Sequence, residues 1–202
     1  MGAECPLRGK AKGCARKKPQ GRPRPKGGRP ERVVLIGYRC SGKTSVGQVL
    51  ATRLGWRFAD TDAEVEREAG RTIADIVAAE GWISFRARER EAVRRLSGER
   101  RIVIAAGGGA VVDEANRAEL KRGATVIYLV CDPATIAARM NADPHTASQR
   151  PALGDRDALE EIGRVLAERE PVYQAACDWR LETAGRGIGE IVAEIGRLLE
   201  ED

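Results

Sequence analysis

The chain has 202 residues, of which 42% are hydrophobic and 32% charged, so it can bury the core of one α/β domain and is not disordered throughout. Aromatic residues make up 4%, too few to predict the base-stacking surface of a single-stranded nucleic-acid binder. The chain has no apolar run of about 18 residues, which excludes a membrane-spanning helix.

The net charge of +5 is distributed unevenly. Residues 1–32 hold 11 Lys or Arg and two Glu, a net charge of +9, so the rest of the chain carries −4. The basic pI does not therefore predict that the folded part binds nucleic acid. Residues 1–31 are rich in Gly, Pro, Lys and Arg and predict a disordered tail before a domain at 32–202. A solvated extension without a role, a polyanion-binding segment and a transit peptide all remain open for this tail.

Cysteine usage indicates a reduced, cytoplasmic compartment. No C-x-x-C pair is present, and the single histidine, His145, gives little support for a zinc site. The N-terminus also lacks the apolar core of a secretory signal. The five cysteines are Cys5, Cys14, Cys40, Cys131 and Cys177.

Strand and helix patterns alternate from residue 32 onward, which predicts a parallel sheet with helices on both faces. A polar segment at 141–156 interrupts the alternation. The predicted strands are 32–37, 56–60, 101–105, 125–130 and 178–181. The predicted helices are 43–54, the helical region 62–97, 113–121, one that begins near Pro133, one that ends near Arg169, and a terminal helix.

The strongest motif is Gly37-Tyr38-Arg39-Cys40-Ser41-Gly42-Lys43-Thr44, which matches G-x-x-x-x-G-K-[ST] in full. It lies between a buried strand and a helix, where backbone N–H groups can face phosphate oxygens. Lys43 can bridge the β- and γ-phosphates, and the Thr44 hydroxyl can ligate Mg²⁺. A glycine-rich turn without a ligand is the alternative. The complete motif and its place between a strand and a helix together favour binding of a nucleoside triphosphate.

Two acids, Asp60 and Asp62, follow the second predicted strand. Ligands of open α/β sheets collect at the carboxyl ends of strands, so one acid can hold the water shell of a metal and the other can accept a hydroxyl proton. A helix N-cap is the alternative. Location beside the phosphate loop favours the functional interpretation.

Arg86 and Glu89 interrupt an apolar helix face that includes Trp82 and Phe85. A charge on a partly buried face needs a partner or a ligand, and Arg can bind a planar carboxylate through two hydrogen bonds. Glu89 could orient Arg86. An ion pair at the edge of the helix, without any ligand, fits equally well.

Three further features belong to the candidate site. Gly107, Gly108 and Gly109 follow the third strand and permit a ligand to approach the backbone closely. Arg169 is predicted at a helix end, where compensation of the helix dipole is the alternative role. Arg150 lies in the polar segment, from which a mobile loop could close over phosphates.

Taken in order, these segments resemble the shikimate kinase family over about residues 32–182. A phosphate loop alone is shared by many folds, whereas the ordered set is specific. The matching segments are GYRCSGKT (37–44), FADTD (58–62), GWISFRARE (81–89), VIAAGGG (103–109) with Asn116-Arg117 beyond it, QRP (149–151) and REPVY (169–173).

The resemblance implies a P-loop kinase fold of the nucleoside-monophosphate-kinase type, three α/β/α layers with a five-stranded parallel sheet in the order 2-3-1-4-5. It implies transfer of the γ-phosphoryl of ATP to the 3-hydroxyl of shikimate, in the route to chorismate and the aromatic amino acids. Asp62 would hold the acceptor hydroxyls and act as base, Arg86 and Arg169 would grip the shikimate carboxylate, Glu89 would hold these arginines, and the backbone of 107–109 would line the pocket.

On the donor side the resemblance implies Mg²⁺, with Thr44 as a direct ligand and Asp60 acting through water. Arg139 would pack on adenine, and Arg150 would reach the phosphates from the lid at about 141–156. The segment between these arginines is longer than is usual for the family. The implied catalytic residues are Asp62, Lys43 and Arg150. The implied ATP-binding residues are Gly37, Cys40, Ser41, Gly42, Lys43, Thr44, Ser45, Arg139 and Arg150.

Two other functions remain open from sequence. A gluconate kinase of the same fold is one, because gluconate is also an acid. A regulatory nucleotide switch whose basic tail contacts nucleic acid or a protein is the other, although Lys43, Thr44, Asp60 and Asp62 are all intact. We expect a monomer whose partners are shikimate and ATP, without membrane or nucleic-acid binding by the domain.

Overall fold

The computed structural model describes residues 31–142 and 155–201. Its centre is one five-stranded parallel sheet in the order β2-β3-β1-β4-β5, as the resemblance implied. All pairings are parallel, so the carboxyl ends of the strands meet at one edge. The strands are β1 (Arg32–Ile36), β2 (Arg57–Asp60), β3 (Ile102–Ala105), β4 (Thr125–Val130) and β5 (Trp179–Glu182).

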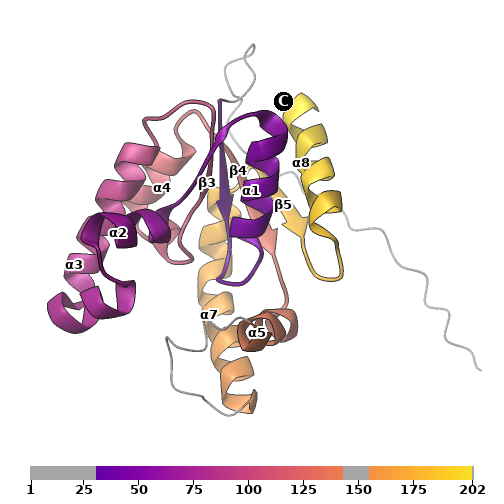
Figure 1. Cartoon of the computed structure of the whole chain (residues 1–202). Coiled ribbons are helices and arrows are strands. Elements are labelled where there is room, and N and C mark those ends of the chain that lie inside the picture. The colour runs from indigo at the N-terminus through magenta and orange to yellow at the C-terminus, as the bar shows by residue number, and fades with distance from the viewer. Residues whose placement is uncertain (1–30, 143–154, 202) are drawn as a thin grey trace, which may run out of the picture.

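Helices cover both faces of this sheet and complete the three predicted layers (Figure 1). α1 and α8 pack on one face, and α3, α4 and α7 pack on the other. The helices are α1 (Lys43–Leu54), α2 (Thr61–Ala69), α3 (Ile73–Leu96), the 3-10 turn η1 (Ala110–Val112), α4 (Glu114–Lys121), α5 (Pro133–Ala142), α7 (Asp155–Ala176) and α8 (Ile188–Glu201). None of the helices in the described part of the chain is long and apolar enough to cross a membrane.

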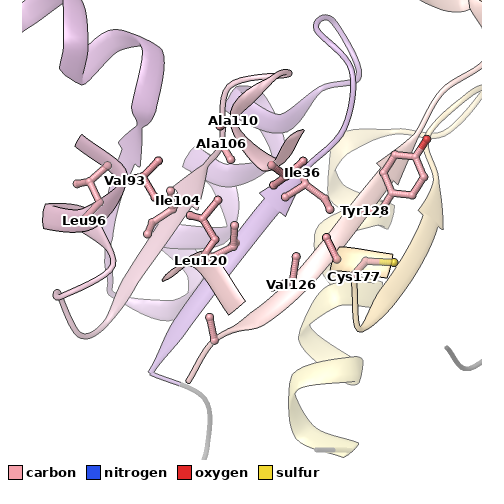
Figure 2. Close-up of a cluster of buried hydrophobic side chains, with 14 of the residues drawn as sticks. Ile36, Val93, Leu96, Ile104, Ala106, Ala110, Leu120, Val126, Tyr128 and Cys177 are labelled. Atoms are coloured by element: carbon pink, nitrogen blue, oxygen red, sulfur yellow. The ribbon is translucent and has the colours of Figure 1, made fainter. Parts of the chain in front are cut away.

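Side chains of β1 alternate between two apolar cores and are all buried, as the continuous apolar sequence predicts for a central parallel strand. Val33 and Leu35 join the core beneath α1 and α8. Ile36 joins the opposite core, where it pairs with Tyr128 in the register of β1 and β4 and lies near Ala110 in Figure 2. The two cores fix the strands against both helical layers and so hold the carboxyl edge in place.

One predicted boundary is wrong: α7 does not end near Arg169 but continues through Pro171 to Ala176. A proline in a helix interior removes one hydrogen bond and costs about 3 kcal/mol. Burial of Tyr173 and Ala176, which are 0% and 1% exposed, offsets this cost in the core. Arg169 therefore lies inside a helix, and compensation of a helix end does not explain it.

A second difference concerns α3, which is interrupted at Gly81 with φ 80° and ψ 171°. Because of this break, Trp82 begins a new first helical turn. Its side chain is 60% exposed and does not lie on the inward face that the spacing predicted. Phe85 and Glu89 do face inward. The predicted lid at 141–156 is helical at its first and last residues; Arg150, His145 and the rest of 143–154 lie outside the described residues.

Candidate active site

The phosphate loop joins β1 to α1 through backbone conformations that favour glycine. Gly37 has φ 144° and Gly42 has φ 98°, and a Cβ on Gly37 would lie 2.6 Å from the carbonyl oxygen of Leu129. Cys40 also has a positive φ, 57°, although it carries a side chain. The motif thus forms the tight turn at the N-terminus of α1 that the sequence predicted.

Lys43 points back into this loop. Its Nζ donates hydrogen bonds to the carbonyl oxygens of Gly37 at 3.0 Å and Tyr38 at 2.8 Å. Burial lowers the pKa of Lys43, and the nearby Asp62 and Asp60 carboxylates oppose that change. The ammonium group therefore lies within the electrostatic reach of Asp60, at the end of β2, and of Asp62, at the start of α2.

Asp60 connects the loop to the start of α2. Its Oδ2 accepts a hydrogen bond from the Thr44 hydroxyl at 2.8 Å, and its Oδ1 accepts one from the backbone N–H of Asp62 at 3.0 Å. Asp60 is therefore the N-cap that the alternative interpretation predicted, and it also lies beside Thr44. A hydroxyl and a carboxylate in contact form a hard oxygen donor set, which suits Mg²⁺ with most of its waters retained.

Asp62 lies in the first turn of α2, against the backbone of Gly107. A Cβ on Gly107 would lie 2.3 Å from Asp62 Oδ1, so this position accepts only glycine without moving the carboxylate. The N–H of Gly107 also donates to the Thr61 hydroxyl at 2.8 Å. Burial, followed by the Asp60 and Glu89 carboxylates, raises the pKa of Asp62 to about 7. A carboxyl that titrates near neutral pH is suited to proton transfer.

Arg86 and Glu89 form an ion pair of 2.6 Å across one turn of α3. The Glu89 side chain is 2% exposed, whereas that of Arg86 is 38% exposed and lies over the ring of Phe85 at 5.1 Å. Burial raises the pKa of Glu89, and the Arg86 guanidinium opposes this. A buried anion thus holds one side of a guanidinium whose remaining donors can reach solvent or a ligand.

Arg169 reaches the glycine segment from α7. Its Nη1 donates to the carbonyl oxygen of Gly108 at 3.0 Å. Arg86 lies against the next glycine, since a Cβ on Gly109 would come within 3.0 Å of its Nη2. Arg169 also acts on the pKa of Glu89 through its charge. The two arginines that the sequence suggested therefore lie on one backbone segment around one buried carboxylate.

Gly108 joins this cluster to the phosphate loop. A Cβ there would lie 3.4 Å from the N atom of Arg39, 3.6 Å from the O atom of Gly37 and 3.8 Å from Nη1 of Arg169. The phosphate loop and Arg169 therefore lie around one point, the place that a side chain on residue 108 would occupy. The phosphate loop, Asp62 and the arginine pair consequently border one region at the carboxyl edge of the sheet.

A cavity of about 390 Å³ opens beside the phosphate loop. Arg139, which the resemblance assigned to adenine, borders it and donates to the carbonyl oxygens of Cys40 at 3.1 Å and Thr183 at 3.4 Å. Sequence analysis missed its far wall, although the rule that ligands gather beyond strand ends would have pointed to the segment after β5. Its lining residues are Cys40, Ser41, Gly42, Lys43, Thr44, Ser45, Val46, Arg139, Thr183, Arg186, Ile188 and Ile191.

Comparison with known proteins decides the family. The family model described as shikimate kinase matches residues 39–200. The shikimate kinase of Oleidesulfovibrio alaskensis is 47% identical over 144 residues, which are 71% of this chain and 83% of that protein. The chain belongs to the shikimate kinase family. The shikimate kinase of Symbiobacterium thermophilum is 45% identical over 169 residues, 84% of this chain and 96% of that protein.

Solved structures agree with this membership. The shikimate kinase of Acinetobacter baumannii in complex with shikimate superposes with a TM-score of 0.77 at 31% identity, covering 85% of this chain and 93% of that one. A gluconokinase from Sinorhizobium meliloti superposes with a TM-score of 0.51 at 21% identity, a likeness that extends to the fold alone. Both the resemblance to shikimate kinases and the expectation of an ATP-dependent kinase are confirmed.

Proposed function

We propose that this shikimate kinase family member transfers the γ-phosphoryl group of ATP to the 3-hydroxyl of shikimate, giving ADP and shikimate 3-phosphate, and so serves the synthesis of chorismate and aromatic amino acids. One observation carries the proposal: the Gly108 carbonyl oxygen bonds to Arg169, and backbone atoms of the phosphate loop lie within 3.6 Å of the place that a side chain on Gly108 would occupy. A small acid held by the arginine therefore lies next to a triphosphate in the loop. Phosphoryl transfer requires mainly such positioning and neutralisation of charge.

The acceptor half uses the arginine pair and Asp62. Arg86 and Arg169 bind the shikimate carboxylate, and Glu89 holds Arg86 by the 2.6 Å ion pair. The backbone of 107–109 forms the floor. The Asp62 carboxylate accepts the proton of the 3-hydroxyl while that oxygen bonds to the γ-phosphorus, and the bond from phosphorus to the β–γ bridging oxygen breaks to release ADP.

The donor half uses the phosphate loop. Lys43 leaves the loop carbonyls for the β- and γ-phosphates, where its charge stabilises the transition state. Thr44 and Asp60 would hold Mg²⁺, and the 2.8 Å contact between the two side chains fits this pairing. When bound, Mg²⁺ neutralises charge on the phosphates.

The remaining roles rest on the resemblance and on placement. Arg139 borders the cavity beside the loop and packs on adenine there. Arg150 lies outside the described residues, and its role at the phosphates rests on the resemblance alone. The enzyme acts as a cytoplasmic monomer, and the basic tail at 1–31 takes no part in turnover.

A coupled assay of ADP release tests the proposal. Shikimate and a panel of other hydroxy acids, gluconate included, are compared at saturating ATP, with the product identified by ³¹P NMR. Shikimate should give the highest kcat/KM and a phosphate on its 3-oxygen. Turnover of gluconate with no turnover of shikimate would refute the assignment.

Arg86→Ala, with Arg88→Ala as its matched control, tests the carboxylate site. Arg88 lies two residues away on α3 and is paired with Glu80 at 3.1 Å, whereas Arg86 lies beside Gly109. Loss of charge-assisted bonds to the carboxylate should raise the KM for shikimate by about 10²-fold and leave the KM for ATP unchanged. Normal shikimate kinetics in Arg86→Ala would remove the basis of the carboxylate site.

A further inference from the structure

We propose that Tyr173 is a positioning residue for acceptor binding: its buried hydroxyl holds the Gly108 carbonyl group and thereby sets the position of Arg169. The inference rests on the proposed function and extends it beyond the residues that touch substrate. Tyr173 belongs to the segment REPVY of the resemblance, in which only Arg169 received a role.

Two donors meet on one acceptor. The Gly108 carbonyl oxygen accepts a hydrogen bond of 2.5 Å from the Tyr173 hydroxyl and one of 3.0 Å from Arg169 Nη1. A carbonyl oxygen has two lone pairs, so both of its acceptor positions are used. When Arg169 turns toward a substrate carboxylate, the Tyr173 bond keeps this carbonyl group paired. Without that hydroxyl, the carbonyl depends on Arg169 alone and competes with the substrate for it.

The tyrosine itself is held rigidly. Its side chain is 0% exposed, and its ring packs against the ring of Tyr128 with a centroid distance of 5.0 Å. The Tyr128 hydroxyl has a different partner, the Glu170 carboxylate, so within this ring pair it is the Tyr173 hydroxyl that bonds to Gly108. Burial raises the pKa of Tyr173, so its hydroxyl remains a protonated donor at neutral pH.

The course of α7 past Pro171 brings these groups together. Tyr173 lies one turn beyond Arg169, so both side chains project from one face of α7 toward Gly108. A helix that ended at Arg169 would leave the tyrosine without a fixed position. Continuation through Pro171 therefore has a consequence for the site as well as for the core.

Tyr173→Phe tests the inference, with Tyr128→Phe as its matched control. Each substitution removes one buried hydroxyl from the same ring pair and keeps the rings, so core packing changes alike in both. Tyr173→Phe should raise the KM and the calorimetric Kd for shikimate by about tenfold, the cost of one unsupported carbonyl bond, and leave the KM for ATP unchanged. Tyr128→Phe should leave all three constants within about twofold of wild type.

Introducing Tyr173→Phe into the Arg169→Ala variant separates a positioning role from a general loss of core stability. If Tyr173 acts through Arg169, Tyr173→Phe adds no further rise in the Kd for shikimate when Arg169 is already absent. Multiplicative effects in the double variant, equal shikimate defects in both Phe variants, or wild-type constants for Tyr173→Phe would each overturn the inference. The proposed function fails separately, if the wild-type protein does not phosphorylate shikimate.

Discussion

Gly107→Ala tests the contact between the glycine segment and the Asp62 carboxylate. A Cβ at residue 107 would lie 2.3 Å from Asp62 Oδ1, 3.0 Å from its Cγ and 3.1 Å from Oδ2. The first distance is more than 1 Å short of an ordinary van der Waals contact, so the whole carboxylate must move by about 1 Å. A displacement of that size at the proton acceptor should lower kcat on the order of 10²-fold.

Stability should respond much less than activity. The obstructing atoms end a side chain that can rotate, and Gly107 does not have a positive φ, so no backbone strain is added. Gly163→Ala is the matched control: it lies in α7, and a Cβ there meets nothing within 4 Å. The Gly163→Ala variant should keep wild-type kcat, and its free energy of unfolding should rise by up to about 1 kcal/mol. The assays are steady-state kinetics, thermal unfolding and calorimetric ATP binding. A kcat of Gly107→Ala within threefold of wild type would refute the reasoning.

Four further predictions concern the titration of Asp62 (two), the Mg²⁺ requirement and the tail. Because Asp62 must be ionised to accept a proton and its pKa is raised to about 7, kcat/KM for shikimate should rise between pH 6 and pH 8; an acid limb near pH 4 would contradict this. The same raised pKa means that the folded state favours the neutral Asp62 carboxyl. Its contribution to the free energy of unfolding, present below pH 4, should therefore be lost as the pH rises through 7. Urea unfolding curves across this range should show that Asp62→Asn abolishes the loss. Thr44→Val keeps the shape of the side chain but removes the hydroxyl that lies 2.8 Å from Asp60. It should raise the Mg²⁺ concentration needed for half-maximal rate at least tenfold. The control Thr52→Val removes a hydroxyl that bonds to the backbone of α1, and it should leave this concentration unchanged. Deletion of residues 1–30 should leave kcat and both KM values within twofold of wild type. If the deletion instead abolished both turnover and salt-dependent binding to a polyanion, the regulatory alternative would be supported.

Local sequence patterns were sufficient for most of the sheet and for the phosphate loop. The apolar run at Val33–Ile36 is typical of a strand buried on both faces, and the glycines at 37 and 42 are needed for the turn that follows. Spacing on α3 also predicted correctly that Glu89 faces inward. These features depend on neighbours in sequence, so periodicity reveals them.

Features that depend on distant contacts could not be predicted in this way. Pro171 indicates a helix end locally, and only the burial of Tyr173 against β4 shows why α7 continues. The break at Gly81 depends on a backbone conformation that glycine permits but does not require. For the far wall of the cavity, the strand-end rule points to the segment after β5, but no motif there shows that Thr183 and Arg186 face the cavity. Tertiary packing decides each of these cases.

The central claim is that one cleft brings the terminal phosphate of ATP to a hydroxyl of an acid held by Arg86 and Arg169. A crystal structure of the full chain with Mg²⁺, a non-hydrolysable ATP analogue and shikimate tests it most directly. We predict the carboxylate on the two guanidinium groups, the 3-hydroxyl on Asp62 and within about 3.5 Å of the γ-phosphorus, and the phosphates in the loop at 37–44. Shikimate bound away from Asp62, or with its carboxylate distant from both arginines, would contradict the account.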